Sequence, residues 1–149
     1  MAEDQQEAVK VKLVLDRLHM HASEANFEGY VALFSPDAVF LGTDAKERWD
    51  LTPFKAYVKQ RFDAGHGWTY TTRERHVFVG VTENFAWFDE MLDNRKYGLL
   101  CRGSGVLVKY DMDWKICQYH LTIPIPNDLV ETVGKLIDDH DVRVVLPST

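Results

Sequence analysis

The chain has 149 residues, of which 46% are hydrophobic, and a chain of this length buries roughly 70% of its unfolded surface in one core. Its formal net charge of -6 and pI near 5.4 argue against nucleic-acid binding, which requires a broad basic surface. The composition therefore predicts a single domain over residues 1–149 with no nucleic acid as partner.

The sequence contains no segment typical of membrane insertion. No window approaches the roughly 18 consecutive apolar residues of a membrane-spanning helix, and the opening "MAEDQQEAVK" lacks the apolar core of a signal peptide. Cys101 and Cys117 lie in strand-like segments without CxxC spacing, which favours reduced structural thiols. We therefore expect a cytoplasmic protein with no membrane partner.

The first half of the chain has the residue spacing of helices. Residues 4–21 place apolar side chains on one helical stripe after a capping-box pattern that begins at Asp4. Residues 27–34 repeat this spacing until Pro36 ends it, and residues 52–64 form a third helical segment. Between the second and third helices, "AVFLG" predicts a short strand.

After Gly67 the hydrophobic period changes to two, which is typical of strands. Four such segments cover residues 68–80, 84–92, 97–110 and 114–123, and their short connections predict an antiparallel meander. A last helix, capped by Asn127, follows them. Helices followed by a meander indicate an α+β fold, in which helices cover one face of a curved sheet.

Two hairpin turns determine which side chains of the meander share a face. A turn at residues 95–96 places Asp89 opposite Arg102, and a turn at residues 111–112 places Arg102 opposite Leu121. The first face then contains Phe85, Trp87, Asp89, Arg102, Ser104, Val106, Cys117, Tyr119 and Leu121. The second face contains Ala86, Phe88, Glu90, Gly103, Gly105, Leu107, Trp114, Ile116, Gln118 and His120.

We assign the first face to a small-molecule pocket, because it combines aromatic side chains with a few polar groups. The second face carries Gly103 and Gly105, whose missing side chains allow another sheet to approach, so we assign it to a homodimer interface. In this arrangement Asp89 points inward and Glu90 points outward toward His120.

The first face supplies the candidate catalytic and binding residues. Asp89 is the candidate general acid or base, because an apolar cavity raises a carboxyl pKa; the alternative is a structural ion pair with Arg102. Arg102 is also a candidate to bind a ligand carboxylate or phosphate. His120 lies near the pocket mouth and is a candidate for substrate binding or for subunit contact.

Aromatic residues complete the predicted pocket, and no cofactor or metal is expected. Trp49, Trp87 and Tyr119 offer flat faces for a ligand, with ordinary core packing as the alternative. The six histidines are scattered without ligand spacing. No phosphate-binding loop or nucleophile elbow is present. The expected partner is a small organic molecule, with a carboxylate among the candidates.

Four strings resemble the nuclear transport factor 2-like superfamily, in its SnoaL-like, ketosteroid-isomerase-related branch: "LFSPDAVFLGTDAKERW", "WFDEMLDN", "RGSGVLVKYDMDWKI" and "QYHLTIPIPN". The resemblance implies a cone-shaped, cystatin-like sheet around an apolar pocket, wrapped by three N-terminal helices, usually in a dimer. It does not imply one reaction. The expected function is small-molecule binding, with cofactor-free acid–base catalysis of isomerase, lyase or hydrolase type as an open option. The alternative is a non-catalytic association module with a vestigial pocket.

Overall fold

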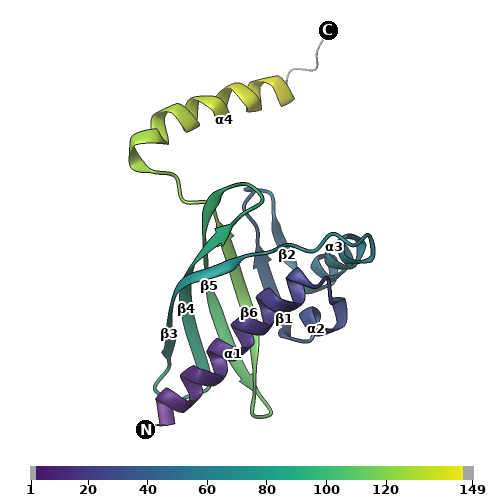
Figure 1. Cartoon of the computed structure of the whole chain (residues 1–149), viewed down its shortest axis with the longest axis vertical. Coiled ribbons are helices and arrows are strands. Elements are labelled where there is room, and N and C mark those ends of the chain that lie inside the picture. Colours follow the sequence, from purple (N-terminus) through teal and green to yellow (C-terminus); the bar gives the residue numbers. More distant parts are fainter. Residues whose placement is uncertain (1–2, 146–149) are drawn as a thin grey trace.

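One long helix lies across the concave face of a six-stranded sheet in the computed structural model, which describes residues 3–145 and the side chains of residues 5–142 (Figure 1). The helices are α1 (Glu3–Ser23), α2 (Phe27–Val31), α3 (Leu51–Asp63) and α4 (Val130–Val145), with a short 3-10 helix η1 (Asn127–Leu129). The strands are β1 (Phe34–Leu41), β2 (Arg48–Asp50), β3 (Thr71–Val79), β4 (Phe85–Asn94), β5 (Leu99–Tyr110) and β6 (Asp113–Thr122).

The sheet has the order β2-β1-β6-β5-β4-β3 and is not closed. Strands β3 to β6 form the predicted antiparallel meander, whereas β1 runs parallel to β6 and antiparallel to β2. The α+β fold with N-terminal helices and a C-terminal helix is therefore confirmed. No helix among residues 3–145 is both long enough and apolar enough to span a bilayer.

The core lies between α1 and the concave face of the sheet. The stripe Val11, Leu15 and Leu18 of α1 is buried, as the helical spacing predicts. On the sheet, every second residue of β4 is buried, which leaves the alternate residues outside. The buried residues on β4 to β6 are Ala86, Phe88, Glu90, Leu92, Cys101, Gly103, Gly105, Leu107, Trp114, Ile116, Tyr119 and Leu121.

The predicted boundaries of the first two helices need correction. Asp4 lies inside α1 and not at its cap. The second helix ends at Val31, and Phe34 and Pro36 belong to β1, where the pairing with β6 is irregular between Phe34 and Val39. Proline lacks the N–H that a regular ladder uses, so it is accommodated at such an irregularity. The short strand β2 was not predicted.

The β5–β6 hairpin explains one part of the error in the predicted face assignment, and the β4–β5 hairpin changes only the partners. The β4–β5 loop contains four residues, 95–98, and not two, so Asp89 pairs with Ser104 instead of Arg102. A shift of two residues leaves each side chain on its face. The β5–β6 turn is at residues 111–112 as predicted, but an irregularity between Val106 and Leu107 shifts the later pairs by one. Tyr119 and Leu121 therefore lie on the face of Glu90.

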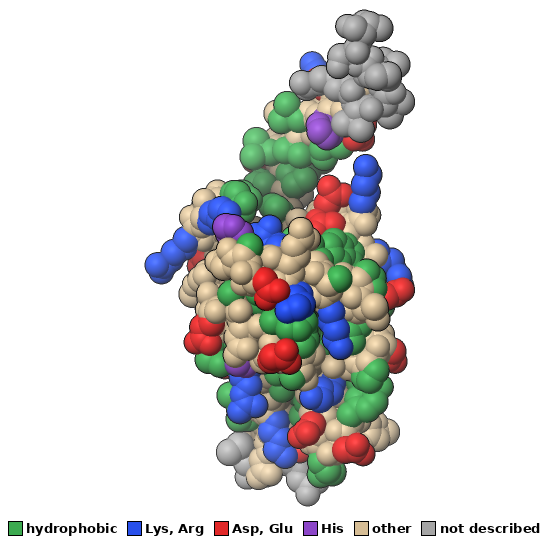
Figure 2. All heavy atoms as spheres, turned by 90° about the vertical axis from the view of Figure 1, so that its right-hand side faces the viewer, with side chains coloured by type: hydrophobic (Ala, Val, Ile, Leu, Met, Phe, Trp, Pro, Cys, Tyr) green, Lys and Arg blue, Asp and Glu red, His purple; other side chains and the backbone are tan. Residues whose placement is uncertain are grey.

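The helix α4 extends away from the sheet and its helices (Figure 1). Its predicted buried face is largely uncovered: Leu129, Val130, Leu136 and Ile137 are 50 to 61% exposed. Figure 2 shows hydrophobic side chains along this helix where it leaves the body of the molecule. The prediction of an amphipathic helix is therefore correct, but within residues 3–145 its apolar face does not pack against the sheet.

A buried carboxylate, Glu7, joins α1 to the end of the β5–β6 hairpin. It accepts a hydrogen bond from Trp114 Nε1 at 2.6 Å and forms ion pairs with Lys10 and Lys109, both at 3.0 Å. Burial raises the pKa of Glu7, but hydrogen bonds from Lys10, Trp114 and Lys109 outweigh it and lower the pKa from 4.5 to about 2. The ionised form is therefore favoured by folding.

We expect Glu7 to contribute stability that depends on pH. Between pH 4.5 and about 2 the unfolded chain binds a proton that the folded chain does not, so its contribution is complete above pH 4.5 and is lost as the pH falls through this window. Glu7→Gln should therefore lower the free energy of unfolding at pH 7, and the difference from the native chain should shrink toward pH 2.5. Urea titrations measure it, with Glu24→Gln on the exposed surface as control. An equal difference at both pH values would contradict this account.

Candidate functional site

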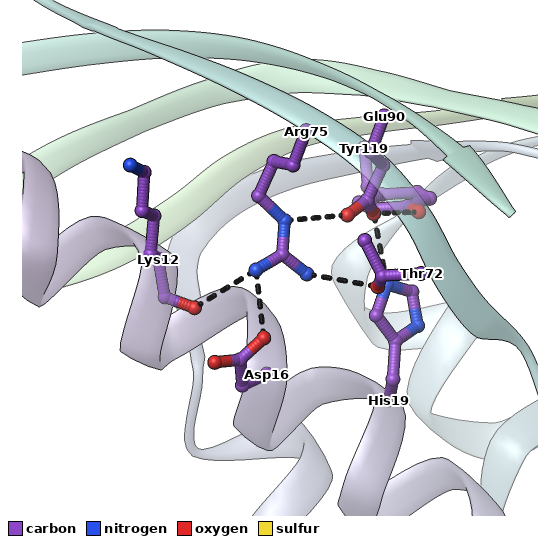
Figure 3. Close-up of polar contacts among 7 residues, drawn as sticks. All are labelled: Lys12, Asp16, His19, Thr72, Arg75, Glu90 and Tyr119. Carbon is purple, nitrogen blue, oxygen red and sulfur yellow. Dashed lines mark hydrogen bonds and ion pairs between the residues drawn. The ribbon is translucent and has the colours of Figure 1, made fainter.

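The polar centre of the molecule is Glu90, which lies on β4 under α1 with no exposed side-chain surface. Its Oε1 is 2.8 Å from His19 Nε2 and accepts a hydrogen bond from the Tyr119 hydroxyl at 2.7 Å. Its Oε2 accepts from Arg75 Nε at 2.8 Å. Figure 3 shows these side chains converging on the carboxylate from α1, β3 and β6. A buried carboxylate is tolerated only with such compensation.

The sheet register places each of these partners. Arg75 on β3 is the direct cross-strand neighbour of Glu90, and Gly103 on β5 is its neighbour on the other side. A Cβ built at Gly103 would collide with the Tyr119 hydroxyl. The missing side chain at Gly103 therefore makes room for the phenol to reach Glu90, and it does not serve the dimer interface that the sequence suggested.

Arg75 is itself held in place by the first helix. Its Nη1 donates to Asp16 Oδ1 at 2.7 Å and to the Lys12 carbonyl at 3.3 Å, and its Nη2 donates to the Thr72 hydroxyl at 3.2 Å (Figure 3). The guanidinium thus connects Glu90 to α1 and fixes the position of the helix that carries His19.

These contacts define the protonation of the network. Burial raises the pKa of Glu90, but the hydrogen bond and charge of His19, the charge of Arg75 and the Tyr119 hydroxyl outweigh it, so the net pKa is lowered. Burial, reinforced by the charge of Glu90, raises the pKa of Tyr119 well above 10, so its hydroxyl stays a donor. With Glu90 ionised, Nε2 of His19 is the hydrogen-bond donor in this contact.

His19 lines a small recess that shares walls with a larger cleft. The recess, about 20 Å³, is bounded by His19, Tyr30 and Tyr119, among others. The cleft has a volume of about 410 Å³, within the range of small-molecule sites. Both share the walls Phe40, Trp68, Tyr70 and Leu121.

Arg61, in the last turn of α3, also lines this cleft. Its guanidinium lies 5.9 Å from the Tyr57 ring centre and 5.8 Å from that of Trp68. Among the side chains that the structure describes, its Nε is the buried polar atom with no hydrogen-bond partner. A buried donor without a partner costs about 1–3 kcal/mol, so such groups call for an explanation.

The predicted site residues divide between the two faces of the sheet. Tyr119 lines the recess, and Trp49 packs edge-on against Tyr57 and Phe54 of the cleft wall, with ring centres 4.4 and 5.9 Å apart. The others lie on the opposite, outer face, away from the cleft: Asp89, Trp87, Arg102 and His120. Their assignment to the pocket is corrected, because the residues of β4 that point inward are Glu90 and the alternate residues on its side of the strand.

His19, Arg75 and Arg61 were missed, although the sequence carries one signal for His19 and one for its partner Glu90. His19 follows Leu15 by four residues on the buried stripe of α1. Glu90 shares its strand face with Ala86, Phe88 and Leu92, which are all apolar. Nothing in the spacing of Arg61 distinguishes it from an exposed helical arginine. Among the described residues, no three His, Cys, Asp or Glu side chains lie together as metal ligands would.

The Arg75–Glu90 pair should couple strongly in a double-mutant cycle. Removing one partner leaves a buried charge uncompensated, so we expect a coupling on the order of 3 kcal/mol between Arg75→Met and Glu90→Gln. Arg73 and Asp93 form a matched control between the same two strands, at 2.6 Å but exposed, and their coupling should stay below about 1 kcal/mol. Urea unfolding of the four variants in each cycle measures both values. Equal couplings would show that burial does not strengthen the inner pair.

Solved structures share the fold at low sequence identity. A protein from Streptomyces avermitilis, provisionally named a dehydratase of the nuclear transport factor 2-like family, is 12% identical, with a TM-score of 0.71 over 82% of this chain and 99% of its own. One from Novosphingobium aromaticivorans, provisionally named a scytalone dehydratase, is 16% identical, with a TM-score of 0.68 over 84% and 89%. One from Nostoc punctiforme, of unknown function with a cystatin-like fold, is 13% identical, with a TM-score of 0.64 over 87% and 98%.

These likenesses establish the nuclear transport factor 2-like, cystatin-like fold that the four strings implied. No curated protein matches the chain by sequence. The profile of the SnoaL-like domain matches residues 11–126, which include every residue of the buried network and of the cleft. The chain therefore belongs to the family of SnoaL-like domains.

Proposed function

We propose that this SnoaL-like domain binds a small organic molecule in the cleft and moves a proton on it through His19. The observation that carries the proposal is the contact of His19 Nε2 with the buried carboxylate of Glu90 at 2.8 Å. A histidine held in this way has a fixed ring and a basic second nitrogen, which is the arrangement of a general base supported by a carboxylate.

The network suits both halves of a proton transfer. Nδ1 takes a proton from a carbon next to a carbonyl, and the negative charge of Glu90 stabilises the imidazolium that forms. The same nitrogen then returns the proton, either to another carbon, which is an isomerisation, or to a leaving hydroxyl, which is a dehydration. Neither reaction requires a cofactor. The names of the two dehydratase-like structures and the resemblance to ketosteroid-isomerase relatives support this reaction class.

Proton exchange with solvent tests the chemistry without knowledge of the natural substrate. We expect 2-tetralone, 3-cyclohexenone or 3-hydroxycyclohexanone to show enzyme-dependent deuterium uptake, isomerisation or loss of water in D2O, followed by proton NMR. His19→Gln retains a donor for Glu90 but has no basic nitrogen, so the rate should fall about 100-fold or more while ligand affinity changes little.

The control for this experiment is His120→Gln, because His120 lies on the outer face of the sheet. It should keep the native rate. If none of the three compounds reacts, or if His19→Gln is as active as the native chain, His19 is not the base, and the reading of the domain as a non-catalytic module gains support. A cytoplasmic location and the absence of a cofactor stay predictions from the sequence.

We also propose that the domain forms a homodimer through the outer face of the sheet, and not through the face that carries Gly103 and Gly105. Phe78, Trp87 and Phe85 form an exposed stack there, with ring centres 5.6 and 5.8 Å apart, and are 46, 44 and 42% exposed. An exposed apolar patch of this kind is typical of a protein contact. A second copy fits it, because a two-fold axis brings identical aromatic side chains together.

Sedimentation velocity tests the dimer. Trp87→Arg places a charge in the centre of the aromatic stack, and we expect it to weaken self-association at least 100-fold, because an interface centre tolerates charge poorly. Val9→Arg adds the same charge on α1, at a position 58% exposed on the other side of the sheet, and should leave the dimer intact. A dimer that survives Trp87→Arg would exclude this face.

A further inference from the structure

Arg61 is a charged group of the cleft that the proposed proton transfer does not use. It lies between the rings of Tyr57 and Trp68, and its buried Nε makes no hydrogen bond within the described part of the chain. Its carbonyl, by contrast, accepts from the His66 backbone N–H at 2.9 Å, so the backbone of the last turn of α3 is held. The backbone that carries the Arg61 side chain is therefore fixed, and Nε is a hydrogen-bond donor without a partner among the described residues.

The cleft is basic although the chain is acidic. Its lining includes Arg61, Arg95 and Lys96 but one carboxylate, Glu47, whereas the whole chain has a formal charge of -6. Glu47 is already engaged, since its Oε1 accepts from the backbone N–H of Asp44 at 3.0 Å. The local excess of positive charge favours an anion in this cleft, and the aromatic walls favour a flat apolar body attached to it.

We propose that the cleft takes a flat organic carboxylate, and that the guanidinium of Arg61, which lines the cleft, binds the carboxylate. A guanidinium fork matches two carboxylate oxygens, and the unpartnered Nε is one arm of that fork. Phe40, Trp68 and Tyr70 wall both the cleft and the recess, so the body of the same ligand extends along them toward His19. This assignment rests on the proposed small-molecule site and adds the substrate class.

A carboxylate is favoured over a phosphate by the position of Arg61. The residue lies in the last turn of α3, where the helix dipole is negative. The negative end of the helix dipole repels a phosphate dianion more strongly than a carboxylate monoanion. The cleft lining also lacks a glycine-rich turn at a helix N-terminus, which is the usual phosphate cradle.

Calorimetric titration with matched probes tests the assignment. The native protein should bind 2-naphthoate at least 10-fold more tightly than 2-naphthamide, which has the same shape without the charge. Arg61→Met should remove this preference while the affinity for the amide stays within about twofold. Arg61→Lys should restore the preference in part, because lysine keeps the charge but not the fork. Arg102→Met, on the outer face, is the matched control and should behave like the native chain.

Three results would overturn the proposal: no binding of naphthoate to the native protein at millimolar concentration, equal affinity for acid and amide, or a preference that survives Arg61→Met. Tighter, Arg61-dependent binding of 2-naphthyl phosphate would replace the carboxylate by a phosphate. Arg61→Met should lose little stability in urea unfolding, because the substitution removes the contacts of the guanidinium with the rings of Tyr57 and Trp68 but no hydrogen bond of Nε. His19→Gln should retain the acid preference, so loss of catalysis and loss of anion binding are scored separately.

Discussion

The structure depends on the compensation of one buried negative charge. The carboxylate of Glu90 is in contact with His19, Tyr119 and Arg75, which come from α1, β6 and β3. None of the three segments can move far without leaving this charge unpaired, and unpaired buried charges are strongly destabilising. The interaction that fixes α1 on the sheet is therefore the same one that orients the histidine proposed as base. Stability and site geometry are not separable at this point of the fold.

The recess and the cleft differ in chemistry. His19, which lines the recess, contacts a carboxylate whose other hydrogen bonds are satisfied within the protein. Arg61, which lines the cleft, has a buried Nε without a hydrogen-bond partner among the described residues. Aromatic side chains form walls common to both cavities. The proposed base and the proposed anchoring charge together would hold a ligand in one orientation, as proton transfer to a single carbon requires.

The fold class follows from local patterns, whereas the site depends on details that they do not contain. Alternation in β3 to β6 and the helical stripe of α1 reflect burial of one face, so they are readable from the residues. The inward face of β4 is a choice between two alternating sets, and the aromatic one, with Phe85 and Trp87, was chosen wrongly. The residues of β4 that include Glu90 point inward, because Arg75, 15 residues earlier in the chain, compensates the charge of Glu90 from the neighbouring strand. A contact of that kind has no short-range signature.

The irregularity in the β5–β6 ladder gives a final consequence. Leu107 pairs with Ile116, but Val106 pairs with Gln118. Cys117 is therefore an extra residue in β6, and it reverses which of the residues after it point inward. Before it, the inward positions are Trp114 and Ile116; after it, they are Tyr119 and Leu121. In relatives that lack this residue, the side chains that follow would point to the opposite face of the sheet. An alignment of family members should therefore place a one-residue gap here, or it will compare the phenol of this chain with side chains that point outward in other members.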